Sequence, residues 1–221
     1  MKELVLDTET TGLSVKEGHR IVEIGCIELD DLIPTKNIFH CYLNPERKVS
    51  EKAFEVHGYT DEFLSDKKKF AEIANDFLLF IKDKKIVIHN ADFDIAHLNN
   101  ELSLIGKSPI QKKNVVDTLD IARNKYPGSS ISLDALCKRY RIDNSKREKH
   151  NALIDCELLS KVYINLLEQK EPTLNFSKKI DINEFNKKTN VEYSKKIISP
   201  TADEIKNHKK FLKENIKKNY F

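Results

Sequence analysis

Two acidic side chains follow a short apolar run near the start of the chain. Leu4 to Leu6 has the composition of a buried strand, and Asp7 and Glu9 come next, two residues apart. Because side chains on a strand alternate between its faces, the two carboxylates are expected to lie side by side. Neighbouring carboxylates repel each other and are costly to bury, and a divalent cation between them removes both costs. The alternative is that the strand ends at Asp7 and both acids are solvated.

A third acid lies where a second predicted strand gives way to a helix. Asp94 follows the short apolar run 86–89, and Asn90 or Asp92 is expected to cap a helix over about residues 93–104. An acid in the first turn of a helix is favourable by about 0.3–1 kcal/mol because of the helix dipole. Asp94 is therefore a candidate metal ligand that also has an ordinary structural explanation.

A fourth acid and a histidine lie at the start of the last long helix, expected over about residues 151–168. Asp155 falls on the apolar stripe of this helix, where an acid is seldom buried unless it is paired or metal-bound. The alternative is a salt bridge to a nearby lysine or arginine. His150, five residues earlier, suits proton abstraction near neutral pH because its unperturbed pKa is about 6.5, although a surface histidine is the alternative.

Four acids on three separate elements and one nearby histidine are the residues that two-metal hydrolysis of a phosphodiester requires. Two cations about 3.5–4 Å apart hold the phosphate, one activating water and the other stabilising the leaving oxygen. Mg²⁺ and Mn²⁺ prefer oxygen ligands, which suits a site made of carboxylates. No glycine-rich phosphate loop, nucleophile elbow or cysteine–histidine signature in the sequence competes with this interpretation.

The elements that must position these residues are strand hairpins, followed by alternating helices and strands. Short connections join the apolar runs over residues 4–6, 21–29 and 38–43, which predicts an antiparallel meander. Helical spacing or capping signals predict further helices over about residues 70–81, 118–125, 133–140 (capped by Ser132) and 151–168. This order predicts an α/β fold with a mixed sheet and helices packed on it.

The acidic segments resemble the three motifs of the DEDDh 3′→5′ exonucleases. Residues 7–12 read D-T-E-T-T-G, residues 89–94 read H-N-A-D-F-D, and His150 precedes Asp155 by five positions. The match extends over about residues 3–168. Residues 56–58, 132–137 and 142–147 resemble more particularly the proofreading subunits of bacterial replicative DNA polymerases.

The resemblance implies a ribonuclease H-like fold with a five-stranded mixed sheet and flanking helices, and it implies roles for individual residues. His150 is implied to be the general base for the attacking water. The implied ligands of two divalent cations, Mg²⁺ or Mn²⁺, are Asp7, Glu9, Asp94 and Asp155. The residues implied to bind the terminal nucleotide are Asp7, Glu9, Thr10, His57 and Asp155. Lys52 stands where the family often carries an acid, which puts the nucleotide contact there in doubt.

Composition and charge distinguish the last 53 residues of the chain from the rest. Residues 169–221 carry thirteen lysines and seven acids, whereas the preceding residues carry a net charge of −3. We expect an exonuclease domain over residues 1–169, a flexible linker over 170–198 and a docking tail over 199–221. In the tail, Thr201 and Glu204 are expected to start a helix that has too little apolar surface to be stable alone.

Other features of the composition concern location. No apolar run approaches the roughly 20 residues that a membrane-spanning helix needs. The cysteines lack C-x-x-C spacing, which argues against a zinc site and favours free thiols in a reducing bacterial cytoplasm. They are Cys26, Cys41, Cys137 and Cys156.

The resemblance also implies function and partners. It implies a proofreading exonuclease that removes mismatched 3′-terminal nucleotides of DNA as 5′-monophosphates. The implied partners are the 3′ end of DNA, the polymerase (alpha) subunit through the tail, the sliding clamp and a small theta-like accessory subunit. Residues 171–176 resemble a clamp-binding motif with Glu171 in place of glutamine, and the alternative is plain linker. Two other functions stay open: a free-standing DEDDh exonuclease acting on RNA or oligonucleotides, and an inactive assembly subunit.

Overall fold

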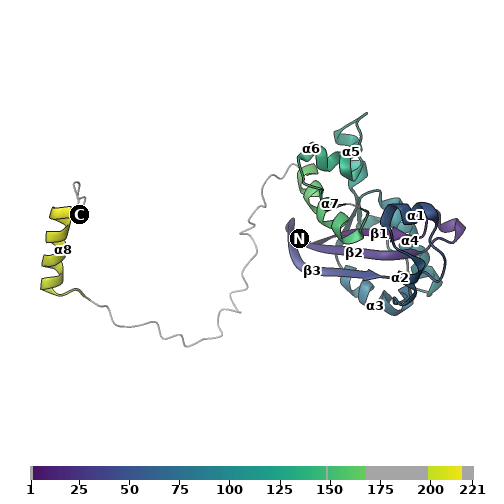
Figure 1. Ribbon diagram of the computed structural model, residues 1–221, viewed down its shortest axis with the longest axis horizontal. Helices are drawn as coiled ribbons and strands as arrows, with labels where there is room; N and C mark the ends of the chain where they lie inside the picture. Colours follow the sequence, from purple (N-terminus) through teal and green to yellow (C-terminus); the bar gives the residue numbers. More distant parts are fainter. Residues whose placement is uncertain (1, 148, 168–198, 216–221) are drawn as a thin grey trace. The chain divides into compact units, whose positions relative to one another are not determined.

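The computed structural model describes residues 2–147, 149–167 and 199–215. The chain divides into two units, Met1–Asn175 and Phe176–Phe221. The first unit is built on one five-stranded sheet with the strand order β3-β2-β1-β4-β5. Figure 1 shows β3, β2 and β1 side by side. Its strands are β1 (Lys2–Thr10), β2 (Ile21–Asp30), β3 (Ile33–Tyr42), β4 (Lys85–Ile88) and β5 (Val115–Asp117).

The sheet is mixed, as predicted, and β1 lies at its centre. β1 pairs antiparallel with β2 and parallel with β4. β3 completes the antiparallel part next to β2, and β5 completes the parallel part next to β4. The third strand begins at Ile33, five residues before the predicted start, and includes Pro34. An edge strand tolerates a proline because it has backbone groups that need no ladder partner.

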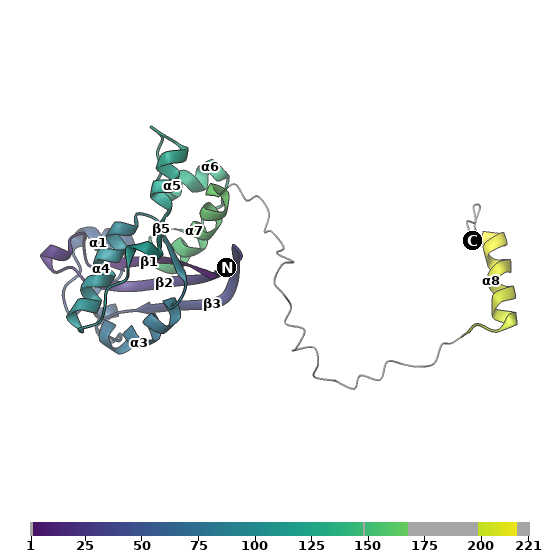
Figure 2. The same cartoon turned by 180° about the vertical axis from the view of Figure 1, so that it is seen from behind.

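Helices cover both faces of the sheet (Figures 1 and 2). Alternate residues of β1 separate two apolar clusters: Leu4 and Leu6 pack with Phe77 and Leu98 on one face, and Val5 packs with α7 on the other. The helices are α1 (Glu51–His57), α2 (Asp61–Ser65), α3 (Phe70–Ile81), α4 (Ala91–Leu104), α5 (Thr118–Lys125), α6 (Leu133–Tyr140) and α7 (Ala152–Leu166), with the 3₁₀ turns η1 (Val15–Glu17) and η2 (Lys112–Asn114).

The predicted cap of α6 is confirmed, and at α4 the predicted cap position is confirmed but not a capping side chain. The Ser132 hydroxyl accepts a hydrogen bond from the backbone N–H of Ala135. At α4, Asn90 occupies the cap position in a left-handed conformation with φ 70°, and its side chain makes no capping hydrogen bond. The carboxylate of Asp117 instead accepts from the N–H groups of Asn90 and Ala91, at 3.1 and 3.0 Å. A carboxylate from the end of β5 thus satisfies donors at the start of α4.

The described part of the second unit is α8 (Ala202–Asn215). The Thr201 hydroxyl accepts from the Glu204 N–H at 3.3 Å, and the Glu204 carboxylate accepts from the Thr201 N–H at 2.7 Å, which confirms the predicted helix start. Ile205 and Phe211 are exposed on this helix. The predicted linker over 170–198, with its clamp-binding motif, lies outside the described residues.

Two further expectations concern the described residues. None of their helices is long and apolar enough to cross a membrane. All four cysteines are free thiols; Cys26, Cys137 and Cys156 are buried and Cys41 is half-buried.

Candidate active site

The carboxyl end of β1 carries the two acids predicted to lie side by side, and α7 packs directly against it. In the β1–β2 register, Asp7 lies opposite Gly25 and Glu9 lies opposite Glu23. A Cβ atom at Gly25 would lie 2.5 Å from the backbone carbonyl carbon of Ala152, a distance that a side chain cannot occupy. Glycine at this position therefore lets the first turn of α7 come close to the acids of β1.

Asp94 reaches the same region from the first turn of α4. Its side chain is buried, and Oδ1 accepts hydrogen bonds from the backbone N–H and the hydroxyl of Thr8, at 3.0 and 2.7 Å. Asp92 serves as a contrast, because it is exposed and pairs with Lys112 at 2.7 Å. Of the two acids in this helical turn, only Asp94 lies beside β1.

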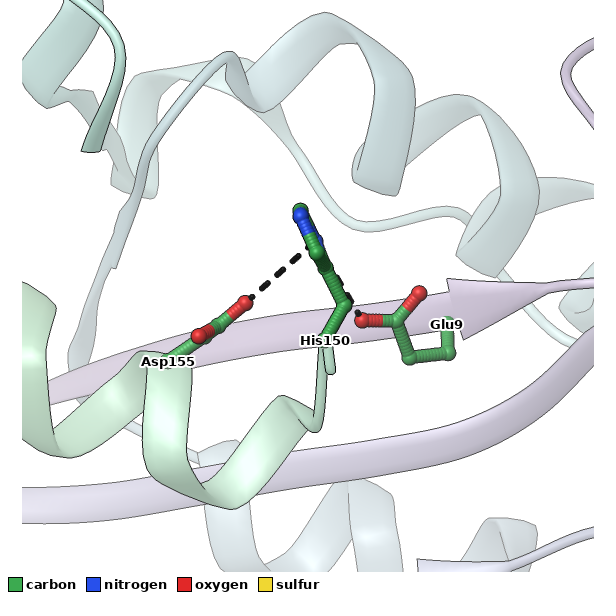
Figure 3. Close-up of side chains that lie close together, drawn as sticks. All are labelled: Glu9, His150 and Asp155. Carbon is green, nitrogen blue, oxygen red and sulfur yellow. Dashed lines mark ion pairs between the residues drawn. The ribbon is translucent and has the colours of Figure 1, made fainter. Parts of the chain in front are cut away.

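Asp155 and His150 complete the cluster from the start of α7 (Figure 3). The Nδ1 atom of His150 lies 3.6 Å from Oδ2 of Asp155 and 3.9 Å from Oε1 of Glu9. Arg147 donates to both carboxylate oxygens of Asp155, to Nδ1 of His150 at 3.0 Å and to Asp134 at 2.8 Å. The salt bridge considered above as the structural alternative for Asp155 is therefore present, and it lies inside the acidic cluster.

Burial and mutual repulsion disfavour ionisation of the acids. Burial, followed by the charges of Asp94 and Glu9, raises the pKa of Asp7 well above its usual 3.8. The pKa of Glu9 is raised to about 8, first by burial and then by the charge of Asp155. Burial raises the pKa of Asp94 to about 7, although the hydrogen bonds from Thr8 oppose this shift. Without a cation these acids therefore favour the neutral form, and a bound cation would stabilise the ionised form.

The cluster fits a metal ion by the chemistry of its donor atoms. One ligand atom each from Glu9, His150 and Asp155 lie within 4.8 Å of one another. Carboxylate oxygens dominate the set, and hard divalent cations such as Mg²⁺ and Mn²⁺ prefer these ligands. The repulsion that raises the pKa of Asp7 indicates that this carboxylate shares the site.

Three of the five residues predicted to contact the nucleotide line a cavity next to the acids. This cavity has a volume of about 510 Å³, and Glu9, Thr10, His57 and Lys52 contribute to its lining. Nδ1 of His57 accepts from the N–H of Tyr59 at 3.0 Å, which leaves Nε2 to donate to the Thr10 carbonyl at 3.3 Å. A second cavity, of about 520 Å³, is lined by Asp7, Arg147, His150 and Asp155 among others. The predicted nucleotide-binding residues are thus divided between two cavities, with Asp7 and Asp155 in the one that His150 also lines.

Sequence reasoning missed three residues that shape the site: Thr8, Glu23 and Arg147. Glu23 carried a usable signal, because it is an acid within the apolar run of β2, as Asp155 is on the apolar stripe of α7. Thr8 donates to Asp94 across a separation of 86 residues, which no local pattern reveals. Arg147 lies in a polar segment between two helices, where an arginine has no distinctive pattern.

Comparisons with known proteins match most of this chain to exonucleases. The model of the RNase T family, described as "Exonuclease", matches residues 4–163. DNA polymerase III subunit epsilon of Rickettsia conorii is 45% identical, over 100% of this chain and 99% of that protein. DNA polymerase III subunit epsilon of Escherichia coli strain K12 is 50% identical, over 74% of this chain and 70% of that protein.

A solved structure shows the same fold at low sequence identity. The nuclease domain of 3′hExo, described as a DEDDh family member bound to rAMP, superposes with a TM-score of 0.66. It is 18% identical, and the match covers 76% of this chain and 92% of that one. The predicted α/β fold with a five-stranded mixed sheet is confirmed.

Proposed function

This chain belongs to the RNase T family of exonucleases and is a 3′→5′ proofreading exonuclease of the DNA polymerase III epsilon type, and we propose that its acidic cluster hydrolyses the terminal phosphodiester with two divalent cations. The observation that carries this proposal is the meeting of four acids from three elements at the end of β1. Asp7 and Glu9 come from β1, Asp94 comes from α4 and Asp155 comes from α7. Their mutual repulsion supports a cation site.

The four carboxylates would hold two Mg²⁺ or Mn²⁺ ions, which activate the attacking water and stabilise the leaving oxygen when bound. His150 would take the proton of this water as the attack on phosphorus proceeds. Its Nδ1 faces the carboxylates and accepts a hydrogen bond from Arg147, so this atom is the unprotonated ring nitrogen, and Arg147 has to release its single lone pair before it can take a proton. Burial, followed by the charge of Arg147, lowers the pKa of His150, which favours the neutral form. The product would be a nucleoside 5′-monophosphate.

The cavity beside Glu9 would receive the 3′-terminal nucleotide. Glu9, Thr10 and His57 would contact it there, and the hydrogen bond from His57 to Thr10 fixes the cavity wall. Asp7 and Asp155 would contact it from the second cavity. Lys52 places a cation on this wall, which suits a polyanionic substrate. A mismatched end unpairs at a lower free-energy cost than a paired one, which would supply part of the selectivity.

The second unit would dock on a partner. α8 exposes Ile205 and Phe211, and an amphipathic helix of this kind gains stability by burying its apolar side chains. We propose that α8 docks on the polymerase (alpha) subunit. The sliding clamp and a theta-like subunit would be further partners of the chain in the bacterial cytoplasm. The tail docks as proposed if the polymerase subunit co-purifies with the full chain and not with a chain that lacks residues 170–221. Co-purification of both forms would contradict this assignment.

The substrate preference has its own test. Single-stranded DNA and RNA of matched sequence, each with a labelled 5′ end, would be digested with Mn²⁺ present. The proposal predicts faster stepwise shortening of the DNA from its 3′ end, and faster again from a mismatched primer terminus than from a paired one. Equal or faster digestion of the RNA would contradict it.

A further inference from the structure

Glu23 on β2 accepts hydrogen bonds from three separate parts of the chain. Its side chain is fully buried. Oε1 accepts from Nε2 of His40 at 2.7 Å and from Nδ2 of Asn151 at 2.8 Å. Oε2 accepts from the hydroxyl of Tyr59 at 2.8 Å and from the backbone N–H of Ala152 at 3.0 Å. Four donors offset the cost of burying this carboxylate, and any movement of α7 against the sheet would break two of these bonds.

Two of these donors come from the start of α7. Asn151 is the N-cap of the helix: its Oδ1 accepts from the Ile154 N–H at 3.1 Å while its Nδ2 binds Glu23. The N–H of Asp155 donates to the Asn151 carbonyl at 2.9 Å, and His150 immediately precedes the cap. The position of the cap therefore sets the positions of both His150 and Asp155.

The other side of the network reaches the nucleotide cavity. Tyr59 stacks on His57, with ring centroids 4.8 Å apart, and its hydroxyl lies 3.0 Å from Nδ2 of Asn151. One carboxylate thus joins the wall of the nucleotide cavity to the start of α7. Among the described residues, none of the side-chain hydrogen bonds of Glu23 goes to a candidate metal ligand. Burial raises the pKa of Glu9 and of Asp7, and the charge of Glu23 adds to both shifts, so a test of the network needs one variant that leaves this charge in place.

We propose that Glu23 is a positioning residue that fixes the first turn of α7, and with it His150 and Asp155, against the acids of β1. This inference rests on the proposed two-metal function. An error of about 1 Å in the placement of reacting groups costs on the order of a hundredfold in rate. Loss of the Glu23 network is therefore expected to affect the chemical step and metal binding more than global folding.

The test compares the full-length Glu23→Gln variant with the wild type on single-stranded DNA at increasing Mn²⁺ concentrations. The glutamine keeps the size of the side chain but turns one acceptor into a donor that faces existing donors. We expect kcat per folded enzyme to fall about tenfold to a hundredfold, and the half-saturating Mn²⁺ concentration to rise several-fold. A kcat and an Mn²⁺ requirement within twofold of wild type would overturn the inference.

The matched control is Glu28→Gln. Glu28 is another buried acid on β2, but it pairs with Lys2 and Lys84, at 3.0 and 2.8 Å. This variant should lower the Tm and leave kcat and the Mn²⁺ requirement unchanged. An equal loss of kcat in both variants would show that any buried acid of this strand matters, and would also overturn the inference.

A second variant decides the matter if Glu23→Gln does not fold. Asn151→Ser keeps a good helix cap and removes the donor to Glu23. It should lower kcat several-fold, and a kcat equal to wild type would overturn the inference. Asp7→Ala separates this result from the proposed function. Activity that survives in Asp7→Ala contradicts the two-metal proposal, whereas an inactive Asp7→Ala beside fully active Glu23→Gln and Asn151→Ser contradicts only the role of Glu23.

Discussion

Arg147 forms a two-pronged salt bridge with Asp155, from Nε to Oδ1 at 2.5 Å and from Nη2 to Oδ2 at 2.8 Å. The two side chains are only 7% and 4% exposed, so the pair is buried. The guanidinium therefore offsets the charge of a carboxylate that we propose as a metal ligand. A cation that binds Asp155 has to displace Arg147 or share the carboxylate with it.

Replacing Arg147 should therefore change stability and metal binding in opposite directions. In Arg147→Gln, the buried carboxylate loses its partner, and breaking such a pair costs about 3–5 kcal/mol. We expect a lower Tm in EDTA and a larger rise in Tm on addition of Mn²⁺, because no guanidinium competes with the ion. Differential scanning calorimetry at increasing Mn²⁺ concentrations measures both quantities. Arg123→Gln, which breaks an exposed pair with Asp120, is the control and should change neither. An Mn²⁺-induced rise no larger than that of wild type would refute the competition.

Removing one acid from the cluster should abolish activity and stabilise the metal-free protein. The pKa of Asp7 is raised by burial and by its acidic neighbours, so above pH 3.8 folding without a cation requires this carboxyl to take up a proton or to stay charged in the interior, and either costs free energy. Asp7→Asn should raise the free energy of unfolding in EDTA and eliminate metal-dependent hydrolysis. Urea titrations and a nuclease assay give the two readouts.

The control for this variant is Asp92→Asn. Asp92 lies two residues from Asp94 but is exposed and paired with Lys112, so neither stability nor activity should change by a measurable amount. Hydrolysis by Asp7→Asn at a rate near that of wild type would remove Asp7 from the metal site.

His150 should contribute to rate rather than to metal affinity. Loss of a general base typically costs 10²–10⁴-fold in rate, and we expect a loss of about this size for His150→Gln. The dissociation constant for Mn²⁺, measured by calorimetry, should stay within about threefold of wild type, because four carboxylates remain. Since Nδ1 lies 3.6 Å from Asp155, a large loss of Mn²⁺ affinity would instead identify this nitrogen as a ligand.

Acid stability should depend on Glu28. Hydrogen bonds from Lys84 and Lys2 lower the pKa of this carboxyl from its usual 4.5 to about 2. A lowered pKa in the folded state stabilises the protein above pH 4.5, and this contribution is lost as pH falls toward 2. The Tm difference between wild type and Glu28→Gln should therefore be largest near neutral pH and vanish near pH 2. A difference that stays constant over this range would mean that the effect is packing rather than charge.

The sequence predicts local features of the structure better than it predicts contacts between distant elements. The boundaries of α5 and α6 follow from capping residues and helical spacing, which act within a few residues. The alternation of Leu4, Val5 and Leu6 determines which face of the sheet Asp7 and Glu9 share. The roles of Thr8, Glu23 and Arg147 depend on contacts between distant elements, and the capping of α4 by Asp117 crosses 27 residues. Local patterns contain no information about such contacts.

The motifs located the acids because a carboxylate within apolar sequence is unusual at any position. The distances between these acids could not be predicted without the fold. Gly25 illustrates this limit: in the sequence it is an ordinary glycine in a strand, and in the fold it is the point where α7 touches β2. A salt bridge of Asp155 was predicted as an alternative to metal binding. In the structure, the same carboxylate both pairs with Arg147 and lies in the candidate metal site.

The number of ions that the acids bind tests the central proposal most directly. Isothermal titration of the metal-free full chain with Mn²⁺, in the presence of a deoxynucleoside 5′-monophosphate, counts bound ions per chain. We predict two ions for wild type and a loss of this binding in Asp7→Asn. A wild-type chain that binds no Mn²⁺ under these conditions, or an Asp7→Asn chain that still binds two ions with wild-type affinity, would contradict the account.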